Sequence, residues 1–228
     1  MKKYILMFGF GLFFILALYN ILSYEYALRA SLEGLRGKLK ATAVNASRAV
    51  DADTLLKIPL KTDADKTQEY KVVYDILSDV KQRQPVIKYI YIMTMTDEPG
   101  ILQYVVDADP LPEIATAKGP TSFSGDKYDA RDVPALLDAY KGPSADEKLI
   151  VDNWGASLSG YAPVYDRNGK PVAILGVDMD ASHLKKTQAM TERLLVIVWI
   201  TGILFLISVV IFCLKAVCSL KENDETHV

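Results

Sequence analysis

Two long runs of uncharged residues constrain this 228-residue sequence more than any other feature. The first covers residues 4–24 and the second residues 194–214, and both consist mainly of large aliphatic and aromatic residues. A helix rises ~1.5 Å per residue, so each run reaches about 31 Å, enough to cross a hydrocarbon core of ~30 Å. Only a helix or a closed barrel satisfies its own backbone polar groups in lipid. The sequence therefore predicts two transmembrane helices.

The first run has an alternative interpretation as a signal peptide that is removed after export. Lys2 and Lys3 supply the basic start that such a peptide needs. However, the run is longer than the ~7–15 apolar residues usual in a signal peptide. Ala27 and Ala30 also form a poor cleavage site, so we favour an uncleaved anchor.

Basic residues beside the two runs predict the orientation of the chain. Lys2 and Lys3 precede the first run, and Lys215 and Lys221 follow the second. Because basic residues stay on the cytoplasmic side, both termini are expected there and the central part is expected outside. Arg193 lies on the opposite flank, but long translocated domains cross the membrane largely regardless of charge.

This reasoning divides the chain into four parts. They are the N-terminus with the first membrane helix (1–24), an extracytoplasmic domain (25–193), the second membrane helix (194–214) and a short cytoplasmic tail (215–228). The central part has the size of one domain with its own core. It carries 22 basic and 25 acidic residues without a basic patch, which argues against nucleic acid as a partner. The tail is too short to fold alone.

The N-terminal part of the domain has helical periodicity. It predicts one long helix from Glu25 to about Ile58, continuous with the first membrane helix and ended by Pro59. Four leucines with heptad spacing lie along it: Leu28, Leu32, Leu35 and Leu39. They indicate either a parallel homodimer contact or an amphipathic helix that packs on its own domain. A second helix is expected at Lys66–Arg83.

The rest of the domain is dominated by β-forming residues in alternating patterns. Strands are expected at residues 86–96, 101–106, 148–151, 157–165 and 171–179, with a short helix at 133–140. Asn168-Gly169 supplies the positive φ that a hairpin turn needs. Residues 107–129, rich in Pro and Gly, are expected to have little regular structure. The predicted fold class is α+β, with a long N-terminal helix and an antiparallel sheet of about five strands.

Six short motifs follow one another in an order known from one family. They are Ala-Val-Asp-Ala-Asp-Thr-Leu (49–55), Tyr-Ile-Tyr-Ile-Met-Thr (89–94), Val-Val-Asp-Ala-Asp (105–109), Asp-Asn-Trp-Gly (152–155), Leu-Ser-Gly-Tyr-Ala-Pro-Val-Tyr-Asp (158–166) and Ile-Leu-Gly-Val-Asp (174–178). After a membrane helix, this order resembles the PAS-like extracytoplasmic sensor domains called Cache or PDC domains. The resemblance covers most of residues 25–190.

The resemblance implies a sensor in the inner membrane of a bacterium. Family members bind small polar ligands, often carboxylates or amino acids, between the sheet and the loops that cover it. They usually continue into an output domain, whereas only residues 215–228 follow the second run here. A sensor of this kind would signal through a separate partner, because the tail has no room for a kinase, a cyclase or a signalling coiled coil.

Asp178 is the first candidate for a ligand-binding residue. It ends an apolar strand, on the same side as Ile174 and Gly176. A half-buried carboxylate needs a cationic partner, such as an amine, a guanidinium or a metal. Alternatively, it accepts hydrogen bonds from backbone amides at the start of the helix that follows.

Seven further residues are candidates for the same pocket, and each has a structural alternative. Tyrosine offers an apolar ring with a hydroxyl, and Trp is a large anchor, yet both are also ordinary core residues. An Asp-x-Asp pair can ligate a cation, but before Pro it is more often part of a turn. The candidates are Tyr89, Tyr91, Met93, Tyr104, Asp107, Trp154 and Tyr161.

No catalytic motif, metal-binding motif or cofactor motif was recognised in the sequence, so we expect neither an enzyme nor a cofactor. The leading hypothesis is a membrane-anchored sensor for a small carboxylate, amine or amino acid-like ligand. The alternatives are a protein-binding assembly module without a small ligand, and a truncated receptor that dimerises with full-length relatives.

Overall fold

The computed structural model describes residues 2–108, 122–152 and 155–225. The chain divides into two compact units. The helical pair comprises the residues up to Ala30 and those from Lys186 onward, and the α/β unit comprises Ser31–Lys185. The helical pair contains both uncharged runs, and the α/β unit contains the whole sheet.

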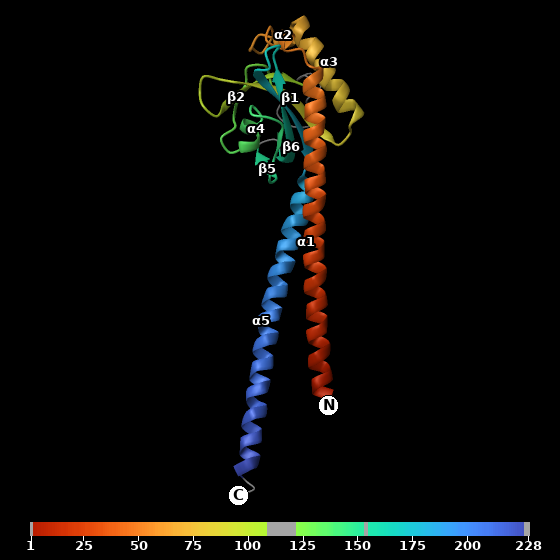
Figure 1. The fold of residues 1–228 in the computed structure, drawn as a ribbon, viewed down its shortest axis with the longest axis vertical. Helices are drawn as coiled ribbons and strands as arrows, with labels where there is room; N and C mark the ends of the chain where they lie inside the picture. The colour runs from red at the N-terminus through yellow and green to blue at the C-terminus, as the bar shows by residue number, and fades with distance from the viewer. Residues whose placement is uncertain (1, 109–121, 153–154, 226–228) are drawn as a thin grey trace. The chain divides into compact units, whose positions relative to one another are not determined.

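The helical pair consists of the first part of α1 (Lys2–Ala49) and most of α5 (Ser182–Glu225), both drawn in Figure 1. Among the described residues, both helices are long and apolar enough to cross a membrane, as the sequence predicts. Phe10 of α1 stacks on Phe205 of α5, with 5.7 Å between the ring centroids. Most of the large apolar side chains on these helices are exposed, an arrangement that favours a lipid environment over water.

The α/β unit is built on one antiparallel sheet. Its strand order is β3-β2-β1-β7-β6-β4, and β5 also pairs with β6. The long strands are β1 (Ile87–Met95), β2 (Ile101–Asp107), β6 (Gly155–Tyr165) and β7 (Pro171–Asp180). The short strands are β3 (Lys127–Asp129), β4 (Ser144–Ala145) and β5 (Ile150–Asp152).

The sheet has seven strands, so the prediction of about five was wrong. The sequence did not indicate β3 and β4, because each is too short to show an alternating pattern. β3 forms against the edge of β2, and β4 forms against β6. Their extended shape therefore depends on the edge that a neighbouring strand offers, and not on their own residues.

The predicted hairpin turn at Asn168-Gly169 is confirmed, and a second turn contains Gly100. Gly100 has a φ of +79° between β1 and β2, and Gly169 has a φ of +77° between β6 and β7. These are backbone conformations that residues with a Cβ rarely adopt. Pro163 remains in register with Ile174 of β7, and it lies beyond the stretches of β6 that pair with β4 and β5. Its missing N–H is therefore tolerated at the edge of the sheet.

One side of the sheet, the aliphatic face, packs against α1 and α3. It includes Ile90 and Ile92 of β1 with Leu175 and Val177 of β7, all fully buried. A Cβ atom at Gly160 of β6 would overlap the backbone of α1 at Leu39. Glycine at this position therefore allows α1 to approach the sheet closely.

The long N-terminal helix ends earlier than the sequence predicted. α1 stops at Ala49, and Asp51 begins a separate short helix, α2 (Ala52–Leu55). The Asp51 carboxylate accepts a hydrogen bond from the backbone amide of Thr54 at 2.9 Å, which caps α2. This local cap competes with continuation of α1, and it explains why the prediction to Ile58 was wrong.

The next helical segment agrees closely with its prediction. α3 spans Gln68–Arg83 and follows a short 3-10 turn, η1 (Ala64–Lys66). The side chain of Thr67 accepts a hydrogen bond from the backbone amide of Tyr70 and so caps α3.

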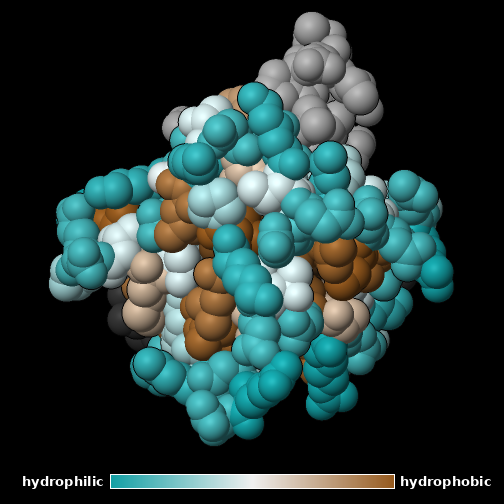
Figure 2. Space-filling view, turned by 90° about the horizontal axis from the view of Figure 1, so that it is seen from above, coloured by the Kyte–Doolittle hydropathy of each residue, from teal (hydrophilic) through white to brown (hydrophobic). Residues whose placement is uncertain are grey.

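Figure 2 views the end of the α/β unit that carries α2, where polar residues separate several apolar patches.

The heptad leucines of α1 that lie in the α/β unit contact their own domain. Leu39 is buried, and Leu32 and Leu35 pack half-buried against the same core. This is the second of the two interpretations offered by the heptad pattern. A homodimer remains a prediction that would have to use other surfaces of α1, in whole or in part.

The opposite side of the sheet, the tyrosine face, is covered by α4 (Pro134–Asp138) and the segments around it. It presents Tyr89, Tyr91, Met93, Tyr104, Tyr161 and Ile174, together with Asp107 and Asp178. Val133, Leu136 and Ala139 pack on it. One sheet therefore separates an aliphatic core from an aromatic and acidic layer.

Candidate functional site

The strand register brings seven of the eight candidate residues to the tyrosine face. Tyr91 lies opposite Asp107 of β2 on one side and Gly176 of β7 on the other. Tyr89 lies opposite Asp178. Because β1 is flanked by both strands, its tyrosines stand between the two carboxylates.

A bulge in β2 completes this arrangement. The register shifts between Ile92 and Met93, which pair with Val106 and Tyr104, so Val105 is an extra residue. Residues three apart in a regular strand point to opposite faces. The extra residue instead places Tyr104 and Asp107 on the same face. The sequence did not reveal this bulge.

Tyr91 links the aromatic and the acidic parts of the site. Its hydroxyl donates a hydrogen bond to Oδ1 of Asp178 at 3.2 Å. Its ring meets the ring of Tyr104 edge to face, with 5.6 Å between the centroids. A Cβ atom at Gly176 would lie 2.5 Å from the Tyr91 ring, so glycine makes the space that the ring occupies.

Burial keeps the phenols of the site protonated. It raises the pKa of Tyr91 well above its usual value, and the negative charge of Asp178 adds to this shift. Burial also raises the pKa of Tyr104, although a hydrogen bond with Ser122 opposes part of the rise. Both hydroxyls are therefore hydrogen-bond donors at neutral pH.

The two carboxylates of the site are nearly inaccessible to solvent. Asp178 has an exposed fraction of 9% and Asp107 of 8%. Moving a charged group out of water is costly unless charged or polar partners compensate. A face with two such carboxylates and several phenol donors is suited to a small cation or to a group that donates several hydrogen bonds.

Tyr161 belongs to the same face, but its hydroxyl has a different partner. It donates to Oδ1 of Asp146 at 3.1 Å, and Oδ2 of Asp146 accepts from the backbone amide of Ser159 at 2.9 Å. Asp146 has an exposed fraction of only 2%. Burial raises its pKa to about 6, against the lowering effect of its hydrogen bonds. The sequence did not point to Asp146, because it lies in a polar run that resembles a surface turn.

Three candidates remain: Met93, Tyr89 and Trp154. Met93 is fully buried in the tyrosine face and serves packing. Tyr89 is half-buried at its rim, where the ammonium groups of Lys88 and Lys81 lie 4.8 Å and 5.8 Å from its ring centroid. Trp154 lies outside the described residues.

Asp180 contacts the start of the following helix, which was the alternative location for the bonds of Asp178. The Asp180 carboxylate accepts a hydrogen bond from the amide of Ser182, the first residue of α5, at 2.8 Å. The side chain of Asp178 accepts a hydrogen bond from Tyr91 on the sheet. Within the described part of the chain, no group of three or more His, Cys, Asp or Glu side chains is arranged to hold a metal ion.

No family model and no curated protein matches the sequence. Solved structures do match it. The ligand-binding domain of the Campylobacter jejuni chemoreceptor Tlp3, in complex with 4-methylisoleucine, is 14% identical with a TM-score of 0.47; the match covers 76% of this chain and 62% of that chain.

Two further matches are also sensory domains. The E. coli DcuS sensor domain is 15% identical with a TM-score of 0.44, and the match covers 69% of this chain and 96% of that chain. The periplasmic sensory domain of the Campylobacter jejuni chemoreceptor Tlp1 is 12% identical with a TM-score of 0.43, covering 72% of this chain and 59% of that chain. Against the two chemoreceptor domains, this chain spans only about 60% of their length.

Proposed function

We propose that this chain is a membrane-anchored sensor that binds a small ligand on the tyrosine face through a cationic group. The convergence of Asp178, Asp107 and Tyr91 on one buried face carries this proposal. Two carboxylates on one buried face attract a positively charged group. A ligand ammonium group would provide such a charge.

The arrangement of the chain in the membrane is part of the proposal. Residues 25–193 form the extracytoplasmic domain, and residues 4–24 and 194–214 cross the bilayer of a bacterial inner membrane. Two helices of sufficient length and apolar character support this layout. Both termini would lie in the cytoplasm, and a separate partner would receive the signal.

Charge decides which part of a ligand meets the site. Asp107 and Asp178 are both acidic and flank the same tyrosine. A ligand carboxylate would be repelled by the carboxylates of Asp107 and Asp178. A ligand ammonium group would be attracted to them and could donate three hydrogen bonds. An amino acid-like ligand would therefore place its ammonium group at Asp178 and its carboxylate away from both aspartates.

Three probes that share one branched carbon chain test this assignment by calorimetry on the full chain in lipid nanodiscs. Isobutylamine presents a cation at neutral pH, isovalerate presents an anion, and L-valine presents both groups. We expect saturable binding of isobutylamine and L-valine but not of isovalerate. Binding of isovalerate without isobutylamine would show that the cationic assignment is wrong.

A matched pair of variants locates the binding. Asp178→Asn keeps the shape of the side chain but removes its charge, so a charge-assisted bond worth ~1.5–3 kcal/mol is lost, or roughly ten- to a hundredfold in affinity. Asp138→Asn, at an exposed position on α4, is the control and should bind as the wild type does. If none of the three probes binds any variant, the protein-binding module becomes the better description.

A further inference from the structure

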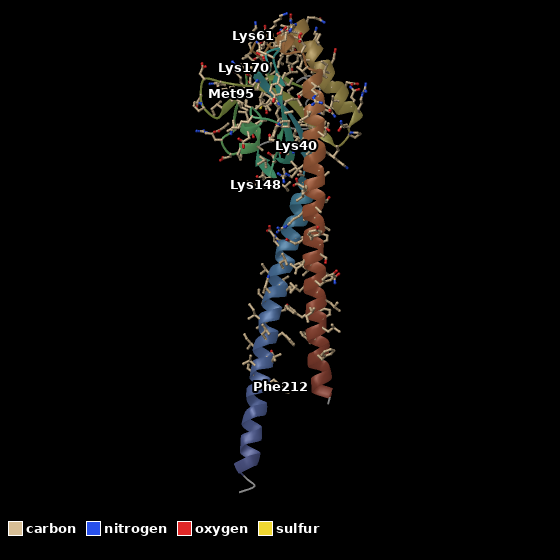
Figure 3. All side chains as sticks on the ribbon, viewed as in Figure 1. Lys40, Lys61, Met95, Lys148, Lys170 and Phe212 are labelled. Atoms are coloured by element: carbon tan, nitrogen blue, oxygen red, sulfur yellow. The ribbon has the colours of Figure 1, made fainter. Side chains whose placement is uncertain are left out.

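A pocket of the α/β unit lies apart from the proposed ligand site, between the last two turns of α1 and the end of β6. Its volume is about 370 Å³, which falls in the range of ~300–1,000 Å³ typical of small-molecule pockets. None of the described residues that line it belongs to the tyrosine face. Figure 3 labels one lysine on each of the two segments that bound it, Lys40 on α1 and Lys170 on the hairpin of β6 and β7.

The walls of this pocket are mainly apolar. Val44 of α1 and Val50 just after α1 line it, and both pack in the aliphatic core. Pro143, which precedes β4, and Pro163 of β6 line it as well, together with Tyr165, which is 49% exposed. The rings of proline and tyrosine present flat surfaces and lose little conformational freedom on contact. The pocket therefore fits a flat apolar body.

Arg48 is the one charged residue among the described residues that line the pocket. It lies in the last turn of α1 and is exposed. Within the described ranges, its guanidinium has no carboxylate partner and no hydrogen bond, and the hydroxyl of Tyr165 has no hydrogen bond either. A guanidinium presents its N–H donors in a planar fork that matches a carboxylate. The polar part of the pocket therefore offers a positive charge and hydrogen-bond donors, which suit an anion.

The aspartates nearest to Arg48 already have other partners. Three of them line an adjoining pocket that Arg48 also reaches. Asp51 caps α2 through Thr54, as described above, and Asp53 pairs with Arg167 at 2.7 Å. The third, Asp166, accepts hydrogen bonds from backbone amides of its own turn at 2.8 Å and 2.9 Å. These bonds leave the charge of Arg48 to a ligand.

We propose that this pocket, called here the Arg48 pocket, is a second binding site, for a small monocarboxylate with a flat apolar body. Arg48 binds the carboxylate through two parallel N–H groups, and the hydroxyl of Tyr165 donates a further hydrogen bond. Pro143 and Pro163 contact the apolar body. The site is independent of the proposed sensor function, because it uses other residues on the other side of the sheet.

Two probes of matched shape test the charge of the ligand by calorimetry on the full chain in phosphatidylcholine nanodiscs. Benzoate is an anion at neutral pH, and benzamide has the same ring and nearly the same outline without the charge. We expect saturable binding of benzoate and none of benzamide. Absence of saturable benzoate binding, or equal binding of the two probes, would overturn the proposal.

A matched pair of arginine variants locates the carboxylate. Arg48→Gln removes the charge that lines the pocket, so benzoate should bind roughly tenfold or more weakly. Arg167→Gln is the control, because it lowers the net charge equally but removes an arginine that already pairs with Asp53. It should bind benzoate as the wild type does. Equal losses in the two variants would mean a general attraction to positive charge, and the pocket would be wrong.

Tyr165→Phe guards against a folding defect in Arg48→Gln. An arginine in the last turn of a helix also interacts favourably with the helix dipole, so Arg48→Gln could lower the melting temperature. Tyr165→Phe removes only a hydroxyl at an exposed position, and it should weaken benzoate binding roughly threefold. If Tyr165→Phe keeps the wild-type affinity, benzoate does not occupy the Arg48 pocket.

Titrations with benzoate and isobutylamine separate this inference from the proposed function. We expect Asp178→Asn to bind benzoate as the wild type does, and saturation with isobutylamine to leave benzoate affinity unchanged. Isovalerate has no ring to place against the prolines and Tyr165, so we expect no saturable binding of it here either. If benzoate and isobutylamine compete, the Arg48 pocket is wrong and the tyrosine face stands. If isobutylamine does not bind but Arg48→Gln alone loses benzoate, the pocket stands and the proposed function is wrong.

Discussion

The two faces of the sheet are made by the same strands and yet differ in chemistry. On β1, Ile90 and Ile92 point to the aliphatic face, while Tyr89 and Tyr91 point to the tyrosine face. The aliphatic face gains stability from close packing against α1 and α3. The tyrosine face instead buries carboxylates, which cost stability unless they are compensated. The proposed function assigns a different role to each face: the aliphatic face holds the fold together, and the tyrosine face recognises the ligand.

The largest expected effect concerns the aliphatic face. Leu175→Ala, at a fully buried position of β7, leaves a cavity in the aliphatic face and should lower the free energy of unfolding by about 2–5 kcal/mol. Thermal melts of the full chain in nanodiscs measure this loss. Val72→Ala, at an exposed position of α3, is the control and should change stability little. If Leu175→Ala and Val72→Ala lower the free energy of unfolding equally, the aliphatic face is not the main source of stability.

The next effect concerns the buried charge of Asp146. Its folded-state pKa of about 6 lies above the value of about 4 expected in the unfolded chain. Between these two values the unfolded chain has released the proton and the folded chain still holds it. Stability therefore falls as pH rises through this window, by on the order of 2 kcal/mol.

Asp146→Asn lacks this titration and isolates it from all the others. The wild type should lose stability relative to Asp146→Asn as the pH rises from about 4 to about 7, as measured by denaturant unfolding at each pH. A stability difference between the two chains that does not vary with pH would contradict the raised pKa.

Two glycines give the smallest and most specific comparison of the faces. Gly160→Ala adds a methyl group against the backbone of α1, which cannot give way, so we expect a loss of about 1–3 kcal/mol. Gly176→Ala instead meets the side chain of Tyr91, which can rotate, so the loss should be nearer 1 kcal/mol. Gly176→Ala should weaken isobutylamine binding, because Tyr91 would move from Asp178, and Gly160→Ala should not. If Gly160→Ala weakened isobutylamine binding and Gly176→Ala did not, the two faces would have been assigned the wrong roles.

The sequence predicted the elements that carry their own signal. The four long strands and α3 have clear periodicity, and the Asn168-Gly169 turn has a specific backbone requirement. Alternation along β7 also predicted that Asp178 shares a face with Ile174 and Gly176. These features depend on neighbouring residues, so the local pattern is sufficient to find them.

The features that were missed depend on contacts between distant residues. The β2 bulge that turns Asp107 toward Tyr91 is visible only in its pairing with β1. Asp146 acquires its role because the pairing of β4 with β6 brings Tyr161 to it, across 15 residues of sequence. A single sequence contains no local signal for either contact.

The most direct test of the account compares Asp178→Asn with Leu175→Ala in two measurements, isobutylamine affinity of the folded protein and melting temperature. The account predicts that Asp178→Asn weakens binding roughly tenfold or more and melts close to the wild type. It predicts that Leu175→Ala melts lower and binds with unchanged affinity. If Asp178→Asn keeps the wild-type affinity, or if both variants lose affinity in proportion to their loss of stability, the tyrosine face is not the recognition site.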